Sequence, residues 1–251
     1  MNKKKLNTSI VFLLNHMDYG GCQKIVFDLI LGVYKSFNKV YLIAKKGYYS
    51  ELLNSNTSIQ FIDRADMSIF GVVKSVKEIQ KSHPSLILHT HNRIDILFKY
   101  ALRKSDIHLH TFHSAYLNKN FLYKFLKPEK SVSISMTVKR YLNRYNIDNQ
   151  MIYNGVDVHT SQKRFRPKQL EAPKLLYVGR LSEEKGFDKL LKALLVYKYN
   201  GTNQIQFDVV GDGGNIESYK NIIESSEGSL KVNFKGYTPN PWDNINEYDI
   251  L

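Results

Sequence analysis

Cysteine is almost absent from this sequence: Cys22 is its only one, so no disulfide can form within the chain. Scarce cysteine is typical of proteins in a reducing cytoplasm. Long apolar runs are absent as well, and the longest, residues 10–14, is far too short to cross a bilayer. The lysines at residues 3–5 are not followed by an apolar segment of signal-peptide length. We therefore expect a cytoplasmic protein.

Acidic residues are scarce in one part of the chain only. Residues 1–150 hold 23 Lys and Arg against 10 Asp and Glu, whereas residues 151–251 hold 13 of each. The formal charge of +13 therefore lies in the first part. Such a basic region indicates an anionic partner, either nucleic acid, anionic lipid or a phosphorylated acceptor, unless dispersed lysines only confer solubility. No nucleic-acid-binding motif is present, which argues against nucleic acid.

Short apolar runs alternate with stripes of helical periodicity along the chain. This alternation predicts an α/β fold built on parallel sheets with helices on both faces. We predict strands at residues 9–14, 40–44, 59–62, 86–91, 107–113, 131–135, 175–178, 205–210 and 230–234. We predict helices at residues 25–33, 68–82, 94–102, 136–145, 187–195 and 216–223, with a short helix or loop at 47–53.

Residues 175–186, Leu-Leu-Tyr-Val-Gly-Arg-Leu-Ser-Glu-Glu-Lys-Gly, are the most informative stretch. An apolar strand breaks at Gly179, a loop carries Arg180 and Lys185, and a helix follows Gly186. A helix N-terminus with free backbone N–H groups, flanked by an Arg and a Lys, can bind a diphosphate. The alternative is that both cations are ordinary surface residues.

The whole stretch resembles the donor-phosphate loop, G-R-x-x-x-x-K-G, of the family 4 glycosyltransferases. The resemblance implies the GT-B fold, in which two Rossmann-like domains face each other across a cleft. In that family the Arg and Lys hold the diphosphate of a nucleotide sugar and stabilise it as it leaves. It therefore implies catalytic roles for Arg180 and Lys185, and a place in the donor site for Gly179.

Other motifs of the same family follow in order. Gly20 and Gly21 resemble its G-G-x-E loop under the donor phosphates, although Gln23 stands where Glu is usual. Asn154 lies in a segment similar to I-x-N-G-V-D, which forms part of the cleft floor. Near the donor base and ribose, the resemblance implies roles for Gly211, Gly213 and Tyr237; there Gly214 replaces the usual Pro.

Five histidines cluster at predicted strand ends: His89, His91, His108, His110 and His113. Each H-x-H pair lies on one face of a strand and could share a metal ion, but no Cys or carboxylate is nearby in sequence to complete the ligand set. Residues 111–114 resemble the T-x-H motif of the family, whose His reaches the donor sugar near the bond that breaks. The resemblance implies this role for His113, and His91 and Asn92 are predicted to line the cleft.

Residues 118–127 interleave aromatic residues and leucines with lysines. This pattern is typical of a helix on an anionic membrane surface, and equally of a packed helix with an exposed lysine edge. Related enzymes of the family often act on lipid-linked acceptors at the inner leaflet, so we expect membrane contact.

The resemblance also suggests how the domains are arranged. Residues 1–160 are predicted to form the acceptor-side Rossmann-like domain, 161–173 a linker, and 174–251 a partial nucleotide-sugar-binding domain. The E-x7-E motif of the family is missing after residue 237. We therefore expect either a fragment or a truncated product without activity.

The predicted function is a retaining glycosyltransferase that moves a sugar from a nucleotide diphosphate donor to a glycan or lipid-linked acceptor, in cell-surface polysaccharide synthesis. The sequence contains no Asp-x-Asp, so we expect no metal requirement and no other cofactor. The alternatives are a GT-B epimerase, a GT-B phosphorylase and a non-catalytic nucleic-acid-binding protein.

Overall fold

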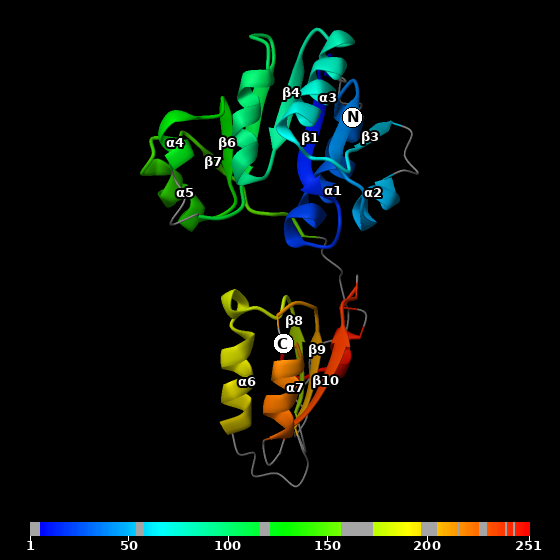
Figure 1. Ribbon diagram of the computed structural model, residues 1–251, viewed down its shortest axis with the longest axis vertical. Helices are drawn as coiled ribbons and strands as arrows, with labels where there is room; N and C mark the ends of the chain where they lie inside the picture. The colour runs from blue at the N-terminus through cyan, green and yellow to red at the C-terminus, as the bar shows by residue number, and fades with distance from the viewer. Residues whose placement is uncertain are drawn as a thin grey trace. The chain divides into compact units, whose positions relative to one another are not determined.

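The computed structural model describes residues 6–53, 58–115, 121–156, 173–196, 205–214, 216–225, 230–238, 240–242 and 244–251. The chain divides into two compact units, Met1–Val158 and His159–Leu251. Each unit contains its own parallel sheet (Figure 1). The predicted linker lies outside the described residues except for Pro173.

The first unit is built on a seven-stranded sheet in which every neighbouring pair is parallel. The strand order is β3-β2-β1-β4-β5-β6-β7. The direction of winding reverses between β1 and β4, and loops that follow such strands border the crevice in which doubly wound domains bind ligands. The strands are β1 Ser9–His16, β2 Val40–Lys45, β3 Ile59–Asp63, β4 Leu86–Thr90, β5 Ile107–Phe112, β6 Lys130–Ser133 and β7 Gln150–Met151.

The central strand β1 explains the continuous apolar run in the sequence. Its residues 9–14 are all buried, because both faces of the sheet are covered at this point. Ile10 and Phe12 belong to a core cluster that includes residues of α1, Gly21–Val33. Val11 and Leu13 belong to a second cluster with residues of α3, Ile69–Lys81.

Helices connect these strands, and some of them are 3-10 helices. Ser68 caps α3 by accepting a hydrogen bond from the backbone N–H of Gly71. The helix predicted at 94–102 is a 3-10 helix, η2, started by a capping box between Asn92 and Asp95. The remaining elements of this unit are η1 Tyr34–Ser36, α2 Tyr48–Leu53, η2 Arg93–Ala101, α4 Phe121–Phe125 and α5 Met136–Asn143.

The stretch at 118–127 is described from residue 121 onward and contains the five-residue helix α4. Tyr123 and Leu126 are buried in a core cluster with Phe112. Phe125 is exposed, beside the exposed Lys124. Two apolar side chains of this stretch, Tyr123 and Leu126, therefore pack in the core of the unit, and Phe125 does not.

The second unit carries a three-stranded parallel sheet in the order β10-β9-β8. Helices α6 (Phe187–Val196) and α7 (Ile216–Glu224) run along this sheet (Figure 1), and their apolar residues share one core cluster with Phe207 of the sheet. Near residue 250, the chain pairs with β8 through the N–H of Leu176 and the carbonyl of Ile250. The elements are β8 Lys174–Val178, η3 Glu183–Lys185, α6 Phe187–Val196, β9 Ile205–Val210, α7 Ile216–Glu224, β10 Leu230–Gly236 and η4 Ile245–Glu247.

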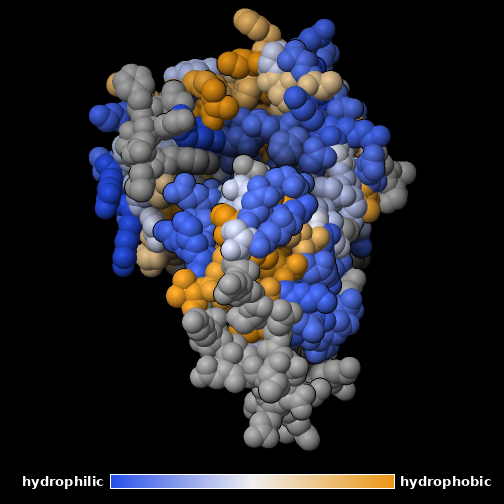
Figure 2. All heavy atoms as spheres, turned by 60° about the horizontal axis from the view of Figure 1, so that its bottom comes forward, coloured by the Kyte–Doolittle hydropathy of each residue, from blue (hydrophilic) through white to orange (hydrophobic). Residues whose placement is uncertain are grey.

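The surface in the view of Figure 2 is largely hydrophilic, with apolar side chains exposed in small groups among polar ones. Among the described residues, each helix is too short or too polar to cross a bilayer.

Candidate functional site

The predicted site residues of the first unit lie at one edge of its sheet. Gly20 and Gly21 follow β1, and Gly21 is the first residue of α1. His91 and Asn92 follow β4, and His113 follows β5. Because β1, β4 and β5 are adjacent and parallel, the loops that follow them meet at the same edge.

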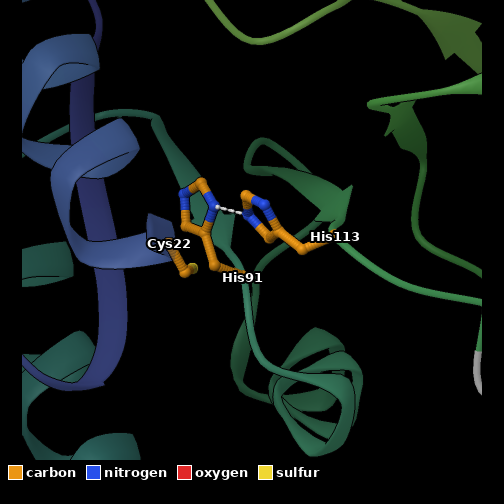
Figure 3. Close-up of side chains that lie close together, drawn as sticks. All are labelled: Cys22, His91 and His113. Carbon is orange, nitrogen blue, oxygen red and sulfur yellow. Dashed lines mark hydrogen bonds between the residues drawn. The ribbon is translucent and has the colours of Figure 1, made fainter. Parts of the chain in front are cut away.

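Two of these residues are in direct contact. The ring nitrogens His91 Nδ1 and His113 Nε2 lie 3.0 Å apart and form a hydrogen bond. The thiol of Cys22, from the first turn of α1, joins them (Figure 3): one ligand atom from each of the three side chains lies within 4.8 Å of the others. Cys22 was not anticipated from the sequence. The signal that could have found it is its place directly after the glycine pair, in the helix that follows β1, the strand beside β4.

Burial keeps this group of side chains uncharged. It lowers the pKa of His113 to about 4 and, together with the neighbouring histidines, puts the pKa of His91 well below its usual value. Burial also raises the pKa of the Cys22 thiol to about 12, with a further contribution from Asp95. At neutral pH both imidazoles are therefore neutral, each with one N–H donor and one acceptor nitrogen.

The remaining histidines of the cluster form separate hydrogen bonds. His89 Nε2 lies 2.8 Å from Thr111 Oγ1. His108 and His110 both bond the hydroxyl of Thr90, at 2.8 Å and 2.6 Å. The hydroxyls of two buried threonines thus hold three histidines in the interior of the sheet, and only His91 and His113 meet at its edge.

Asn92 lies at the same edge but has a structural partner. The Asp95 carboxylate accepts hydrogen bonds from the backbone N–H and the side-chain amide of Asn92, at 3.1 Å and 3.0 Å. Burial raises the pKa of Asp95 to about 7, although these hydrogen bonds oppose the shift. The carboxylate therefore caps a helix, and the amide of Asn92 is engaged with it.

Asn154 lines an apolar pocket of about 560 Å³ on one face of the sheet. The predicted apolar stripe of α1 is divided there: Val26 and Ile30 are buried, whereas Leu29 is half-buried and lines the pocket. The pocket is also lined by residues of β1, β4, β5 and the loop that follows β7. His89 and Thr111 from the histidine network belong to this lining.

In the second unit, the predicted donor residues also gather where the strands end. Gly179 and Arg180 follow β8, Gly211 and Gly213 follow β9, and Tyr237 follows β10. Backbone hydrogen bonds join these loops, from the N–H of Gly179 to Val210 at 3.0 Å and from the N–H of Gly211 to Gly236 at 2.8 Å.

Two glycines of these loops are required by the backbone geometry. Gly211 and Gly213 have φ angles of 147° and 101°, which residues with a Cβ rarely adopt. A Cβ at Gly211 would also overlap the carbonyl oxygen of Gly179. Glycine at Gly211 therefore allows the loops after β8 and β9 to approach each other closely.

The two predicted cations extend from this edge into solvent. The Arg180 side chain is 70% exposed and pairs with Glu184 at 3.6 Å. The Tyr177 hydroxyl donates a 2.9 Å hydrogen bond to the backbone carbonyl of Arg180, so the loop is fixed independently of the guanidinium. Lys185 is exposed in η3, and among the described residues it forms no ion pair.

Two polar atoms beside this loop were not anticipated from the sequence. Ser182 Oγ and Asp188 Oδ1 are buried and have no hydrogen-bond partner among the described residues. Asp188 lies in the first turn of α6. That helix begins directly after Gly186, the C-cap residue of η3, which has a φ of 71°. Buried polar atoms without partners are uncommon and often accompany functional sites.

Family models match the chain from residue 19 onward. Residues 19–160 match the family model described as Glycosyltransferase Family 4, and residues 159–251 match the one described as Glycosyl transferases group 1. Curated proteins gave no significant match.

Solved structures of GT-B glycosyltransferases are similar in fold at low identity. Anabaena HepE in complex with UDP-glucose has a TM-score of 0.66 and 14% identity, over 92% of this chain and 69% of that chain. The lipopolysaccharide outer core galactosyltransferase WaaB has a TM-score of 0.67 and 18% identity, over 96% and 71%. A TarM variant of S. aureus, in complex with fondaparinux, alpha-GlcNAc-glycerol and UDP, has a TM-score of 0.65 and 12% identity, over 93% and 78%.

Proposed function

This chain belongs to glycosyltransferase family 4, and from that membership we propose that it is a retaining enzyme that uses a nucleotide diphosphate sugar. The proposed acceptor is a glycan or a lipid-linked saccharide, and the proposed role is cell-surface polysaccharide synthesis. HepE is similar in fold and was solved with UDP-glucose, which makes UDP-sugars the first donors to test.

The observation that carries the proposal is the edge formed by the loops after β8, β9 and β10. Arg180 and Lys185 extend two exposed cations there, beside glycine loops that neighbouring backbone groups hold in place. A guanidinium binds phosphate oxygens in a fixed fork, and an ammonium adds a mobile positive charge. These cations would stabilise the charge that grows on the departing diphosphate, so we propose that transfer requires no metal ion.

Residues of the first unit are proposed to act on the donor sugar. His113 is neutral at physiological pH, and its hydrogen bond to His91 orients its ring. A neutral imidazole can hydrogen-bond a sugar hydroxyl without adding charge beside the reacting carbon. We propose the same region, with Gly20, Gly21 and Asn154, as the wall of the sugar site.

The carboxylate of Asp95 does not fit the role of a nucleophile, because it is buried and accepts hydrogen bonds from Asn92. From the resemblance to retaining enzymes of the GT-B fold, we propose a reaction on one face of the sugar. In this reaction, the acceptor hydroxyl loses its proton to the departing phosphate, the new glycosidic bond forms, and the bond from the anomeric carbon to that phosphate breaks.

We also propose that the first unit contacts an anionic membrane surface from the cytoplasmic side. The basic excess of residues 1–150 supports this, and Phe125 lies exposed beside Lys124. Flotation with vesicles that contain anionic phospholipid should recover the protein at low salt. Absence of flotation would remove the membrane from the proposal, and salt-sensitive binding to RNA or DNA would favour nucleic acid instead.

A thermal-shift screen with UDP-, GDP- and ADP-sugars tests the donor. We expect one nucleotide class to raise the melting temperature, because a ligand that binds only the folded state stabilises it. Transfer to an added glycan acceptor should then occur with the stabilising donor. Free epimerised sugar would indicate an epimerase, a strict phosphate requirement would indicate a phosphorylase, and no response to any donor would contradict the proposal.

A further inference from the structure

Cys22, His91 and His113 come together from three different parts of the chain. Cys22 lies in the first turn of α1, and the two histidines follow β4 and β5. One ligand atom from each lies within 4.8 Å of the other two, and the facing imidazole nitrogens are 3.0 Å apart (Figure 3). The structure thereby supplies the sulfur ligand that sequence proximity could not.

We propose that these three side chains bind a divalent transition-metal ion that accepts sulfur and nitrogen ligands, Zn²⁺ above all. Sulfur and imidazole nitrogen are the ligands that zinc prefers, and three protein ligands leave the fourth tetrahedral position for water or an anion. Mg²⁺ and Ca²⁺ prefer oxygen ligands and do not match this set.

The distances are close to those of a tetrahedral site. With Zn–N bonds of about 2.0–2.1 Å, two coordinating nitrogens lie about 3.3 Å apart, and a coordinating sulfur lies about 3.6 Å from each. The facing nitrogens of His91 and His113 are 3.0 Å apart, so they need to move apart by only about 0.3 Å. The remaining pairs lie within 4.8 Å and need to close by at most about 1.2 Å.

The surroundings also suit a bound metal ion. His91 is 3% exposed. The ring of Phe12 stacks against His91 with centroids 6.3 Å apart, so one side of the site is apolar. An apolar shell restricts solvent access to a metal ion.

A bound ion would also affect transfer, and this consequence rests on the proposed function. The ion would occupy the ring nitrogen of His113 that faces His91, and would fill the space beside the donor sugar. We therefore expect Zn²⁺ to inhibit transfer reversibly, with activity restored by a chelator. This inference is compatible with transfer that needs no metal, because the ion acts here as an inhibitor.

Cobalt is the probe for the site, because Co²⁺ replaces Zn²⁺ and its absorption spectrum reports the ligands. Titration of the full chain with Co²⁺ should give intense visible bands of tetrahedral geometry and a near-ultraviolet band of thiolate-to-cobalt charge transfer. Cys22→Ser should abolish the charge-transfer band, and His113→Gln should weaken binding at least about ten-fold. His83→Asn is the matched control: His83 bonds Ser9 and Tyr41 in a different part of the unit, so the spectrum should not change.

The outcomes separate this proposal from that of a transferase. Weak visible bands of six-coordinate cobalt, unchanged by Cys22→Ser, would overturn the metal site and leave a hydrogen-bonded histidine pair. Zinc affinity provides a second test, by competition with a chromogenic chelator. The metal site would also be overturned if Cys22→Ser, shown to be folded by circular dichroism, bound zinc as tightly as the parent chain. If the cobalt bands appear and no donor supports transfer, the metal site stands and the proposed function fails.

Discussion

Replacement of Arg180 by Ala should reduce catalysis without loss of stability. The side chains of Arg180 and Glu184 are 70% and 77% exposed, and they approach at 3.6 Å. An exposed ion pair of this kind contributes about 0–1 kcal/mol to folding. The loop keeps the hydrogen bond from the Tyr177 hydroxyl to the backbone carbonyl of residue 180. A change in melting temperature is therefore not expected.

The catalytic effect should be much larger. Removal of one group that stabilises developing negative charge costs about 2–4 kcal/mol in the transition state. At about 1.36 kcal/mol for each factor of ten, this corresponds to a roughly 30- to 900-fold loss in kcat/KM for the donor. Because the charge develops as the phosphate leaves, kcat should fall more than donor affinity.

The assay compares the parent chain, Arg180→Ala and the matched control Glu184→Gln. The control breaks the same ion pair but keeps the guanidinium, so we expect it to retain parental kcat/KM within about threefold. An Arg180→Ala variant with normal folding and kcat/KM within about threefold of the parent would refute the assigned role. An equal loss in both variants would indicate that the ion pair, and not the charge of Arg180, is important.

Three further predictions concern stability. Burial opposes the charge of Asp106, but hydrogen bonds from Arg103 outweigh this effect and lower the pKa of Asp106. The ionised Asp106 should therefore stabilise the fold above the unfolded-state pKa of about 3.9. This contribution to the free energy of unfolding should disappear as pH falls through the folded-state pKa. Urea unfolding below about pH 4 should show this loss, and Asp106→Asn should show a flatter dependence on pH. Gly211→Ala should lower the free energy of unfolding by about 1–3 kcal/mol, because φ is 147° and the new Cβ overlaps the Gly179 carbonyl; unchanged stability would contradict the tight loop contact. Gly32→Ala, in a helix with nothing near the new Cβ, should instead raise the free energy of unfolding by about 0.5–1 kcal/mol, and thermal unfolding checks the sign.

Much of the fold was predictable because its signals are local. The continuous apolar run of β1 follows from burial on both faces, and Ser68 marks the start of α3 as an N-cap. The type of helix at 93–101 was not predictable, because an apolar stripe at that length does not distinguish an α-helix from a 3-10 helix. The stripe of α1 likewise did not reveal that one side, including Leu29, lines an open pocket.

The candidate site was predictable in a different way. The glycine loops and the exposed cations of the second unit follow neighbouring strands, as the pattern of strand, glycine loop and helix predicts. The pairing of the histidines was not predictable, because sequence spacing groups His108 with His110 and His89 with His91. The structure instead pairs His91 with His113 across neighbouring strands.

Strand order explains why Cys22 could not be found by proximity in the sequence. Parallel strands require crossovers of a dozen or more residues, so side chains that meet at one sheet edge are distant in the chain. Here β1, β4 and β5 are neighbours, and they bring a thiol from α1 to two imidazoles. A search for metal ligands in a doubly wound domain should therefore compare the residues that follow adjacent strands of the sheet. By that criterion the two units differ in chemistry: the first brings together one thiol and two imidazoles at least half-buried, whereas the second carries the exposed cations Arg180 and Lys185.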